Sequence, residues 1–202
     1  MDVTGRVFDL LGQGADDAAA LAAPGRTDMT FRALRQHCAR IRRQLAARDI
    51  GPGDRVAIVL PNGPEMASAF FAVASGLSAA PLNPAYKESE YAFYLEDLKP
   101  KLVIVAQDSD NPVRAAAGSL NIPVAEALVG PEDPAGAFTL WAEEADDTAP
   151  GPGDEALVLH TSGTTSRPKV VPLTQANLFA SASNIASTLA LTPVDHCLNI
   201  MP

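Results

Sequence analysis

Cysteine is scarce in this sequence, and the signals of a secreted or membrane protein are missing. Cys38 and Cys197 are the only cysteines, and two thiols so far apart do not make a disulfide framework. A reducing compartment is therefore favoured, and we expect a cytoplasmic protein. No run of about 18 apolar residues could span a bilayer, and the N-terminus lacks the basic and apolar regions of a secretory signal.

Positive charge is also limited, because 15 lysines and arginines are outnumbered by 24 aspartates and glutamates, which leaves a net charge of −9. Phosphate backbones and anionic membranes select basic surfaces, so this balance argues against a general nucleic-acid binder and against a membrane-surface protein. The 47% of apolar residues indicates a globular chain, and 202 residues suffice for one large or two small domains.

Recognisable constellations of catalytic or metal-binding side chains are missing as well. His160 and His196 have no partners at zinc-ligand spacing, and no nucleophile–base arrangement stands out. Six acidic residues gather in the proline-rich stretch between Gly130 and Gly153, but they lack the spacing of a calcium-binding loop. We therefore predict no metal site and interpret the stretch as a solvated linker, attached to the body by Trp141.

Alternating strand and helix patterns occupy the middle of the chain. Short apolar runs between turn residues predict strands, and longer apolar or periodic stretches predict helices. Strands are expected at Arg55–Leu60, near Pro81 and Leu82, at Lys101–Ala106 and near Val124–Leu128, with helices at Glu65–Ala80, Ser89–Leu98 and near Val113–Leu120. This order is typical of βαβ crossovers, so we predict an α/β fold with a mainly parallel sheet flanked by helices.

Further helices are predicted on both sides of this region. Val7–Ala22 can form a short amphipathic helix, and Thr30 is a good cap for a helix from Phe31 to about Arg48. Residues spaced by three and four give the second helix one apolar stripe: Phe31, Leu34, Cys38, Ile41 and Leu45. Its six arginines are interpreted as a solvated face, with binding of nucleic acid or CoA phosphate as the alternative.

A loop rich in hydroxyl side chains lies between two apolar strands near the end of the sequence. The strands are predicted at Leu157–His160 and Val170–Leu173, and Thr174 can cap a following helix. The loop Thr161–Lys169 contains five hydroxyl side chains, one glycine and two cations. Hydroxyls, cations and backbone N–H groups are the donors that a polyphosphate needs, and Gly163 allows its close approach.

An ordinary polar surface loop is the alternative, since clusters of Ser, Thr, Gly and Pro are usually loops. The dense hydroxyl run before Lys169 favours an anion site instead. The loop is not a P-loop of the GxxxxGK[ST] kind, because Lys169 follows Pro168 and precedes Val170.

The remaining residues are predicted to continue the chain with a helix and a strand. The helix is expected at Ala176–Leu191, with Leu178, Ile185 and Leu189 inward, and the strand at His196–Met201. We place a boundary in the proline-rich stretch. Residues 1–150 are then a first α/β subdomain that ends in the acidic linker, and residues 151–202 begin a second subdomain that carries the hydroxyl-rich loop.

The sequence Thr-Ser-Gly-Thr-Thr-Ser-Arg-Pro-Lys, followed by Pro-Leu-Thr-Gln at 172–175, resembles the signature [ST]-S-G-[ST]-T-G-x-P-K-G of the adenylate-forming enzymes. That family comprises acyl-CoA synthetases, luciferases and peptide-synthetase adenylation domains. The sequence looks most like the oxalate–CoA ligase branch, which includes peroxisomal CoA synthetases. The likeness extends more weakly from about Thr30 to Pro202. Ser166 and Val170 stand where most members have glycine.

The resemblance implies an AMP-forming acid–thiol ligase. A carboxylate attacks ATP to give an acyl-adenylate, CoA displaces AMP, and Mg²⁺ offsets phosphate charge. Oxalate or another small acid is the implied substrate, and fatty acid metabolism is the implied setting. By resemblance, the ATP phosphates are bound by Thr161, Ser162, Gly163, Thr164, Thr165, Ser166, Arg167 and Lys169.

The resemblance also implies that other parts lie beyond Pro202, among them the adenylation lysine, so no catalytic residue is named. We expect the 202 residues to be the N-terminal portion of a ligase and to be inactive alone. The alternative is a non-catalytic nucleotide-binding or interaction module left by truncation. Val170 adds bulk beside the loop, so the Val170→Gly variant is expected to keep or exceed the parent activity.

Overall fold

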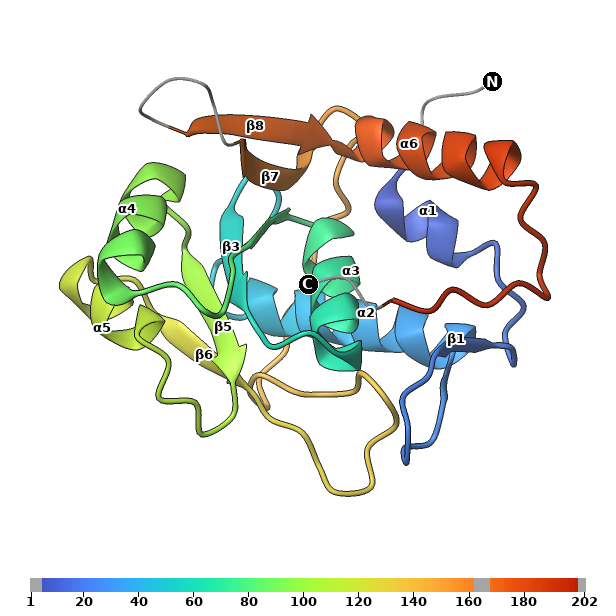
Figure 1. Cartoon of the computed structure of the whole chain (residues 1–202), viewed down its shortest axis with the longest axis horizontal. Coiled ribbons are helices and arrows are strands. Elements are labelled where there is room, and N and C mark those ends of the chain that lie inside the picture. Colours follow the sequence, from blue (N-terminus) through green and yellow to red (C-terminus); the bar gives the residue numbers. More distant parts are fainter. Residues whose placement is uncertain (1–4, 162–167, 200–202) are drawn as a thin grey trace.

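A six-stranded sheet is the centre of the part of the chain that the structure, a computed structural model, describes: residues 5–161 and 168–199 (Figure 1). The strand order is β6-β5-β3-β4-β7-β8. The strands are β3 (Arg55–Val59), β4 (Ser78–Pro81), β5 (Leu102–Ala106), β6 (Val124–Ala127), β7 (Glu155–Thr161) and β8 (Lys169–Thr174). All neighbours are parallel except β7 and β8, which are antiparallel. The predicted α/β fold with a mainly parallel sheet is confirmed.

Helices cover both faces of this sheet. The described helices are α1 (Val7–Leu11), α2 (Phe31–Ala46), α3 (Pro64–Ala74), α4 (Glu88–Leu98), α5 (Val113–Ser119) and α6 (Gln175–Thr188). Val56 and Ile58 of β3 pack in one apolar cluster with α2 and α3, whereas Ala57 and Val59 pack in a second cluster with α4 and α5. Strands buried on both faces explain the continuous apolar runs in the sequence.

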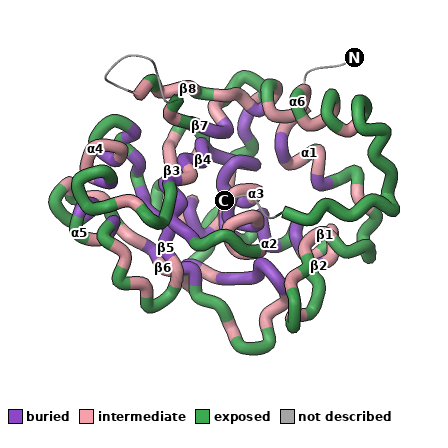
Figure 2. Tube along the Cα trace, in the orientation of Figure 1, coloured by how far each residue is buried: buried purple, intermediate pink, exposed green. Residues whose placement is uncertain are grey.

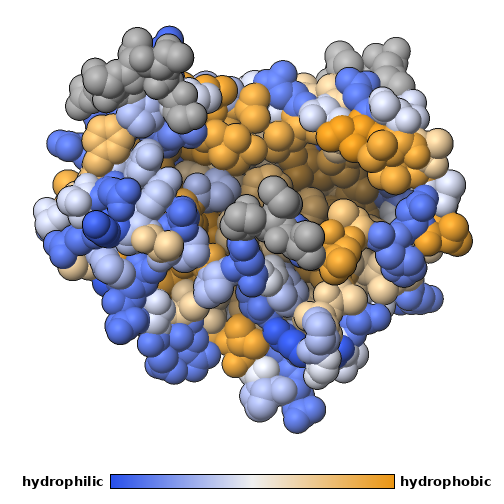
Figure 3. All heavy atoms as spheres, viewed as in Figure 1, coloured by the Kyte–Doolittle hydropathy of each residue, from blue (hydrophilic) through white to orange (hydrophobic). Residues whose placement is uncertain are grey.

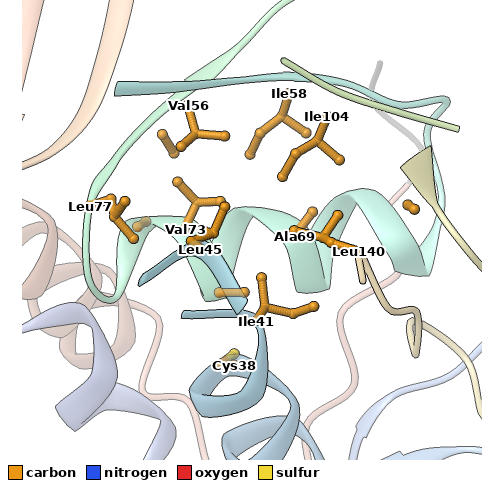
Figure 4. Close-up of a cluster of buried hydrophobic side chains, with 14 of the residues drawn as sticks. Cys38, Ile41, Leu45, Val56, Ile58, Ala69, Val73, Leu77, Ile104 and Leu140 are labelled. Carbon is orange, nitrogen blue, oxygen red and sulfur yellow. The ribbon is translucent and has the colours of Figure 1, made fainter. Parts of the chain in front are cut away.

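The larger cluster lies between the sheet and the helix pair α2–α3 (Figure 4). Four residues of the predicted α2 stripe are at most 1% exposed: Leu34, Cys38, Ile41 and Leu45. Thr30 caps the helix as predicted, because its side chain accepts a hydrogen bond from the N–H of Ala33 at 3.2 Å. Buried residues accordingly concentrate in the middle of the trace (Figure 2).

Two predicted helices are much shorter in the structure. The helix expected from Val7 to Ala22 ends at Leu11, and Ala19–Leu21 forms a short strand, β1, that pairs with β2 (Met29–Thr30). Gly12 and Gly14 weaken a continued helix, and strand pairing supplies the backbone partners instead. Likewise, the helix expected to reach Ala80 ends at Ala74, so β4 begins at Ser78.

The predictions for the end of the chain were wrong in two respects. Ile185 and Leu189, expected to point inward, are 54% and 64% exposed, although Leu178 does pack on the larger cluster. Of the expected strand His196–Met201, residues 196–199 form no strand, and the rest lies outside the described residues. Helical periodicity shows which residues share a face, but not whether anything covers that face.

Four of the six acids in the stretch after Gly130 are exposed, but part of the stretch packs against α2. The indole N–H of Trp141 donates to the backbone carbonyl of Gln44 at 2.8 Å. Arg42 pairs with Asp147 and Arg43 with Glu144, each at 2.6 Å between Nε and a carboxylate oxygen. Three of the arginines expected to form a solvated face, Arg42, Arg43 and Arg48, therefore bind acids of this stretch. The predicted anchoring role of Trp141 agrees with these contacts, and the division at residue 150 stays a prediction.

Membrane insertion through a helix is not indicated by the described residues, because none of their helices has both the length and the apolar character to cross a bilayer.

Candidate functional site

The β7–β8 hairpin carries the two described residues of the predicted phosphate site. Its register pairs Leu159 with Val171 and Thr161 with Lys169 across the two strands. Thr161 and Lys169 are therefore directly opposite each other at the open end of the hairpin, and both are exposed. Six other predicted site residues lie outside the described residues, and their role stays a prediction: Ser162, Gly163, Thr164, Thr165, Ser166 and Arg167.

Thr174 and Gln175 anchor the far end of β8. Thr174 caps α6, since its hydroxyl accepts from the N–H of Asn177 at 3.2 Å and the Asn177 side chain accepts from the N–H of Thr174 at 3.0 Å. The fully buried amide of Gln175 donates to the carbonyl of Ala74 at 2.6 Å and accepts from the N–H of Val7 at 3.0 Å. These bonds tie β8 and α6 to α3 and α1.

An ion pair anchors the start of β7. Both guanidinium nitrogens Nε and Nη2 of Arg55 donate to the carboxylate of Glu155, at 2.8 and 3.0 Å. The hydroxyl of Ser78 donates to the same carboxylate at 2.6 Å. Hydrogen bonds from Arg55, and secondarily from Ser78, lower the pKa of Glu155 below its ordinary value although burial opposes them. The pair links β3, β4 and β7 at one end of the sheet.

The open end of the hairpin is suited to an anion. In the described part of the chain, the ammonium group of Lys169 has no carboxylate partner, and the hydroxyl of Thr161 lies across the ladder from it. An exposed ammonium beside hydroxyl donors attracts phosphate or carboxylate groups. Figure 3 shows a hollowed, mainly apolar area next to β7, β8 and α6. The hairpin therefore places the exposed ammonium of Lys169 opposite the hydroxyl of Thr161, within the limits of the described residues.

His160 was not among the predicted site residues, and the structure gives it a defined place beside them. Its side chain is only 7% exposed, and Nε2 lies 2.9 Å from a carboxylate oxygen of Asp97 on α4. The sequence did contain one signal for this position: His160 is two residues from the buried Val158, so both side chains point to the same face of β7.

The described residues do not test the expectation of Mg²⁺. No group of three or more His, Cys, Asp or Glu side chains among them is placed to hold a metal ion. Carboxylates of the described chain therefore give no support for a resident metal.

Comparisons with known proteins agree with the predicted family. Residues 11–202 match the family described as AMP-binding enzyme. An oxalate–CoA ligase from Arabidopsis thaliana is 37% identical over 195 residues, which cover 92% of this chain and 38% of the relative. A sulfoacetate–CoA ligase from Cupriavidus necator is 32% identical over 181 residues, which cover 86% of this chain and 35% of the relative.

Among solved structures, ATP-bound MatB from Rhodopseudomonas palustris has a TM-score of 0.73 and 26% sequence identity, with coverage of 95% of this chain and 39% of that one. The chain therefore spans well under half of the length of the curated relatives and of this structure.

Proposed function

Because the chain belongs to the family of AMP-binding enzymes, we propose that it supplies the ATP phosphate-binding part of an ATP-dependent carboxylate–CoA ligase. Within this proposal, residues 1–150 are the first α/β subdomain and residues 151–202 begin the second. The observation that carries the proposal is the hairpin that sets Lys169 opposite Thr161 at the two ends of the hydroxyl-rich loop.

The proposed reaction has two steps. A carboxylate oxygen attacks the α-phosphorus of ATP, the bond to the β-phosphate oxygen breaks, and pyrophosphate leaves. The sulfur of CoA then attacks the acyl carbon, and AMP leaves. Negative charge grows on the departing pyrophosphate in the first step, so a fixed cation and fixed donors beside it stabilise that transition state.

Lys169 is assigned to the β- and γ-phosphates, with Thr161 and the loop 162–167 as hydrogen-bond donors. The exposure of Lys169 and its lack of a carboxylate partner within the described chain fit an anionic ligand. We assign no step to Mg²⁺, because the described residues do not test its binding. The adenylation lysine is expected outside these 202 residues.

The substrate is proposed to be oxalate or another small acid. The similarity to an oxalate–CoA ligase supports it, and the similarity to a sulfoacetate–CoA ligase supports a small, doubly charged acid more generally. Pyrophosphate release by the full-length protein, with oxalate, malonate, sulfoacetate, acetate and palmitate in turn, tests this choice. We expect oxalate to be used best. Turnover of palmitate without turnover of oxalate would reject the substrate but keep the reaction class.

A non-catalytic interaction module is the rival function, and one observation favours it. Large apolar side chains are exposed along and after α6, where a partner could cover them: Ile185, Leu189, Leu191, Val194 and Leu198. Two observations separate the two functions: whether the reading frame continues past Pro202, and whether the protein exchanges pyrophosphate with ATP in the presence of the acid. A frame that continues past Pro202, together with exchange that depends on the acid, supports the ligase. A natural stop codon and no exchange support the module.

A further inference from the structure

The open end of the β7–β8 hairpin projects beyond the parallel sheet. Among the described residues, β4 is in register with β7 at a single pair, Ala79 and Leu157, and β4 ends at Pro81. The last residues of β7, His160 and Thr161, therefore pair only with β8. A two-stranded ribbon is marginally stable without further support, so its end needs a packing partner.

Helix α4 is that partner. Nε2 of His160 lies 2.9 Å from Oδ2 of Asp97, and the imidazole ring packs edge-on against Tyr94 with 4.7 Å between ring centroids. An ionised carboxylate can only accept, so Nε2 of His160 carries the proton and donates it. Val170, the cross-strand neighbour of His160, packs on the same cluster of apolar side chains as Tyr94.

The supporting surface of α4 is itself held firmly. Tyr91 is fully buried, and its hydroxyl donates to the carbonyl of Asn83 at 2.8 Å. Tyr86 stacks on Tyr94 with 5.0 Å between centroids and an interplanar angle of 13°. Leu95 and Leu98 of α4 are also buried, in the cluster that contains α5. The acceptor on Asp97 therefore belongs to a rigid element.

We propose that His160 is a positioning residue, which fixes Thr161 and Lys169 relative to the sheet through its hydrogen bond to Asp97 and its contact with Tyr94. Side chains alternate along a strand, so His160 and Val170 face α4, whereas Thr161 and Lys169 face away from it. The contacts of His160 and Val170 with α4 therefore set the position of Thr161 and Lys169 on the opposite face of the hairpin. This inference rests on the proposed function, because it assumes that the loop binds ATP.

Kinetics of the full-length protein test the proposal through separate Michaelis constants. In the His160→Ala and Asp97→Ala variants, we expect the KM for ATP to rise about tenfold, the scale of one hydrogen bond to a charged group. The KM for CoA is expected to stay at the parent value. His160→Gln should restore most of the ATP affinity, because the Gln amide can donate to Asp97. The double variant should be no worse than either single one.

Glu96→Ala is the matched control, because Glu96 is an exposed acid next to Asp97 on α4. It should leave both constants unchanged. A purely structural role for His160 would lower the melting temperature and kcat of its variants at an unchanged KM for ATP, and that result would overturn the proposal. So would a His160→Gln variant as impaired as His160→Ala.

Hydrogen exchange of the full-length protein without nucleotide provides a measurement that does not depend on activity. The amides of residues 169–171 should exchange faster in His160→Ala than in the parent and in Glu96→Ala. Unchanged exchange there overturns the positioning role. A parent protein that shows no acid-dependent exchange of pyrophosphate with ATP instead rejects the proposed function, and with it the link between this contact and ATP.

Discussion

Lys169 is the residue on which the proposed chemistry depends most directly. Its ammonium is exposed at the open end of the hairpin, and pyrophosphate gains charge as it leaves. We expect Lys169→Ala to lower the rate of adenylate formation about a hundredfold, the scale for loss of one preorganised donor, with a smaller change in substrate binding. Single-turnover pyrophosphate release by the full-length protein measures this. If the Lys169→Ala variant had the parent rate, Lys169 would not bind the phosphates, and the loop would be interpreted as an ordinary surface loop.

His37 makes stability depend on pH. The side chain of His37 on α2 is 4% exposed, and its Nε2 has no hydrogen-bond partner among the described residues. Burial, and secondarily the nearby charge of Arg40, lowers the pKa of His37 from 6.5 to about 4. The unfolded chain therefore binds the proton more readily, so stability is complete above pH 6.5 and is lost as the pH falls toward 4.

Between pH 7 and pH 5 this histidine should cost about 2 kcal/mol of unfolding free energy. Urea titrations followed by the fluorescence of Trp141 measure the change, and the His37→Leu variant should lack that part of it. An identical pH dependence in parent and variant would show that other groups are responsible.

Within strand β8, the side chain of Val170 has two opposing effects: it adds bulk beside the loop, and it contributes apolar packing that stabilises the fold. The sequence suggested crowding beside the loop and an activity that glycine keeps or raises. The structure adds that Val170 packs in the cluster with Tyr86 and Tyr94. Val170→Gly should therefore lower the unfolding free energy by about 1–2 kcal/mol, through lost burial and added backbone freedom. Thermal unfolding measures this, with Val170→Ala expected to lie between parent and glycine variant. Equal stability of all three would exclude a packing role.

The bounds of most elements could be predicted because their signals are local. Apart from Arg55 at its start, β3 is an apolar run, as is β5, and α2 has both a capping threonine and a regular stripe. The hairpin strands could be predicted for the same reason. The contacts of His160 and Gln175 could not, because their partners are 63 and 168 residues away in sequence. Such pairings depend on how the elements pack, which local patterns do not specify.

At the scale of the whole molecule, ion pairs hold the acidic stretch 141–147 against α2. Arg42 and Asp147 are the best shielded pair, with side chains 12% and 25% exposed. Their separation should open the stretch, so Arg42→Ala is expected to speed cleavage after Glu143 or Glu144 by a glutamate-specific protease about tenfold. Arg32→Ala is the control, since Arg32 pairs with Asp16 and Asp17 at the open surface. Equal cleavage rates in the two variants would show that the pair of Arg42 and Asp147 does not hold the stretch against α2.

The bond between Gln175 and Val7 has a consequence for the order in which the chain folds. The first helix, α1, has five residues, which is too short to persist in water without packing, and its buried partner is the last of the described helices. During synthesis from the N-terminus, the hydrogen bond of Val7 can therefore form only after Gln175, 168 residues later, has left the ribosome. The parallel strands β3 to β6 can assemble earlier, because their partners are already present. A nascent chain arrested before Gln175 should consequently hold α1 only through its apolar contacts with α2 and α3.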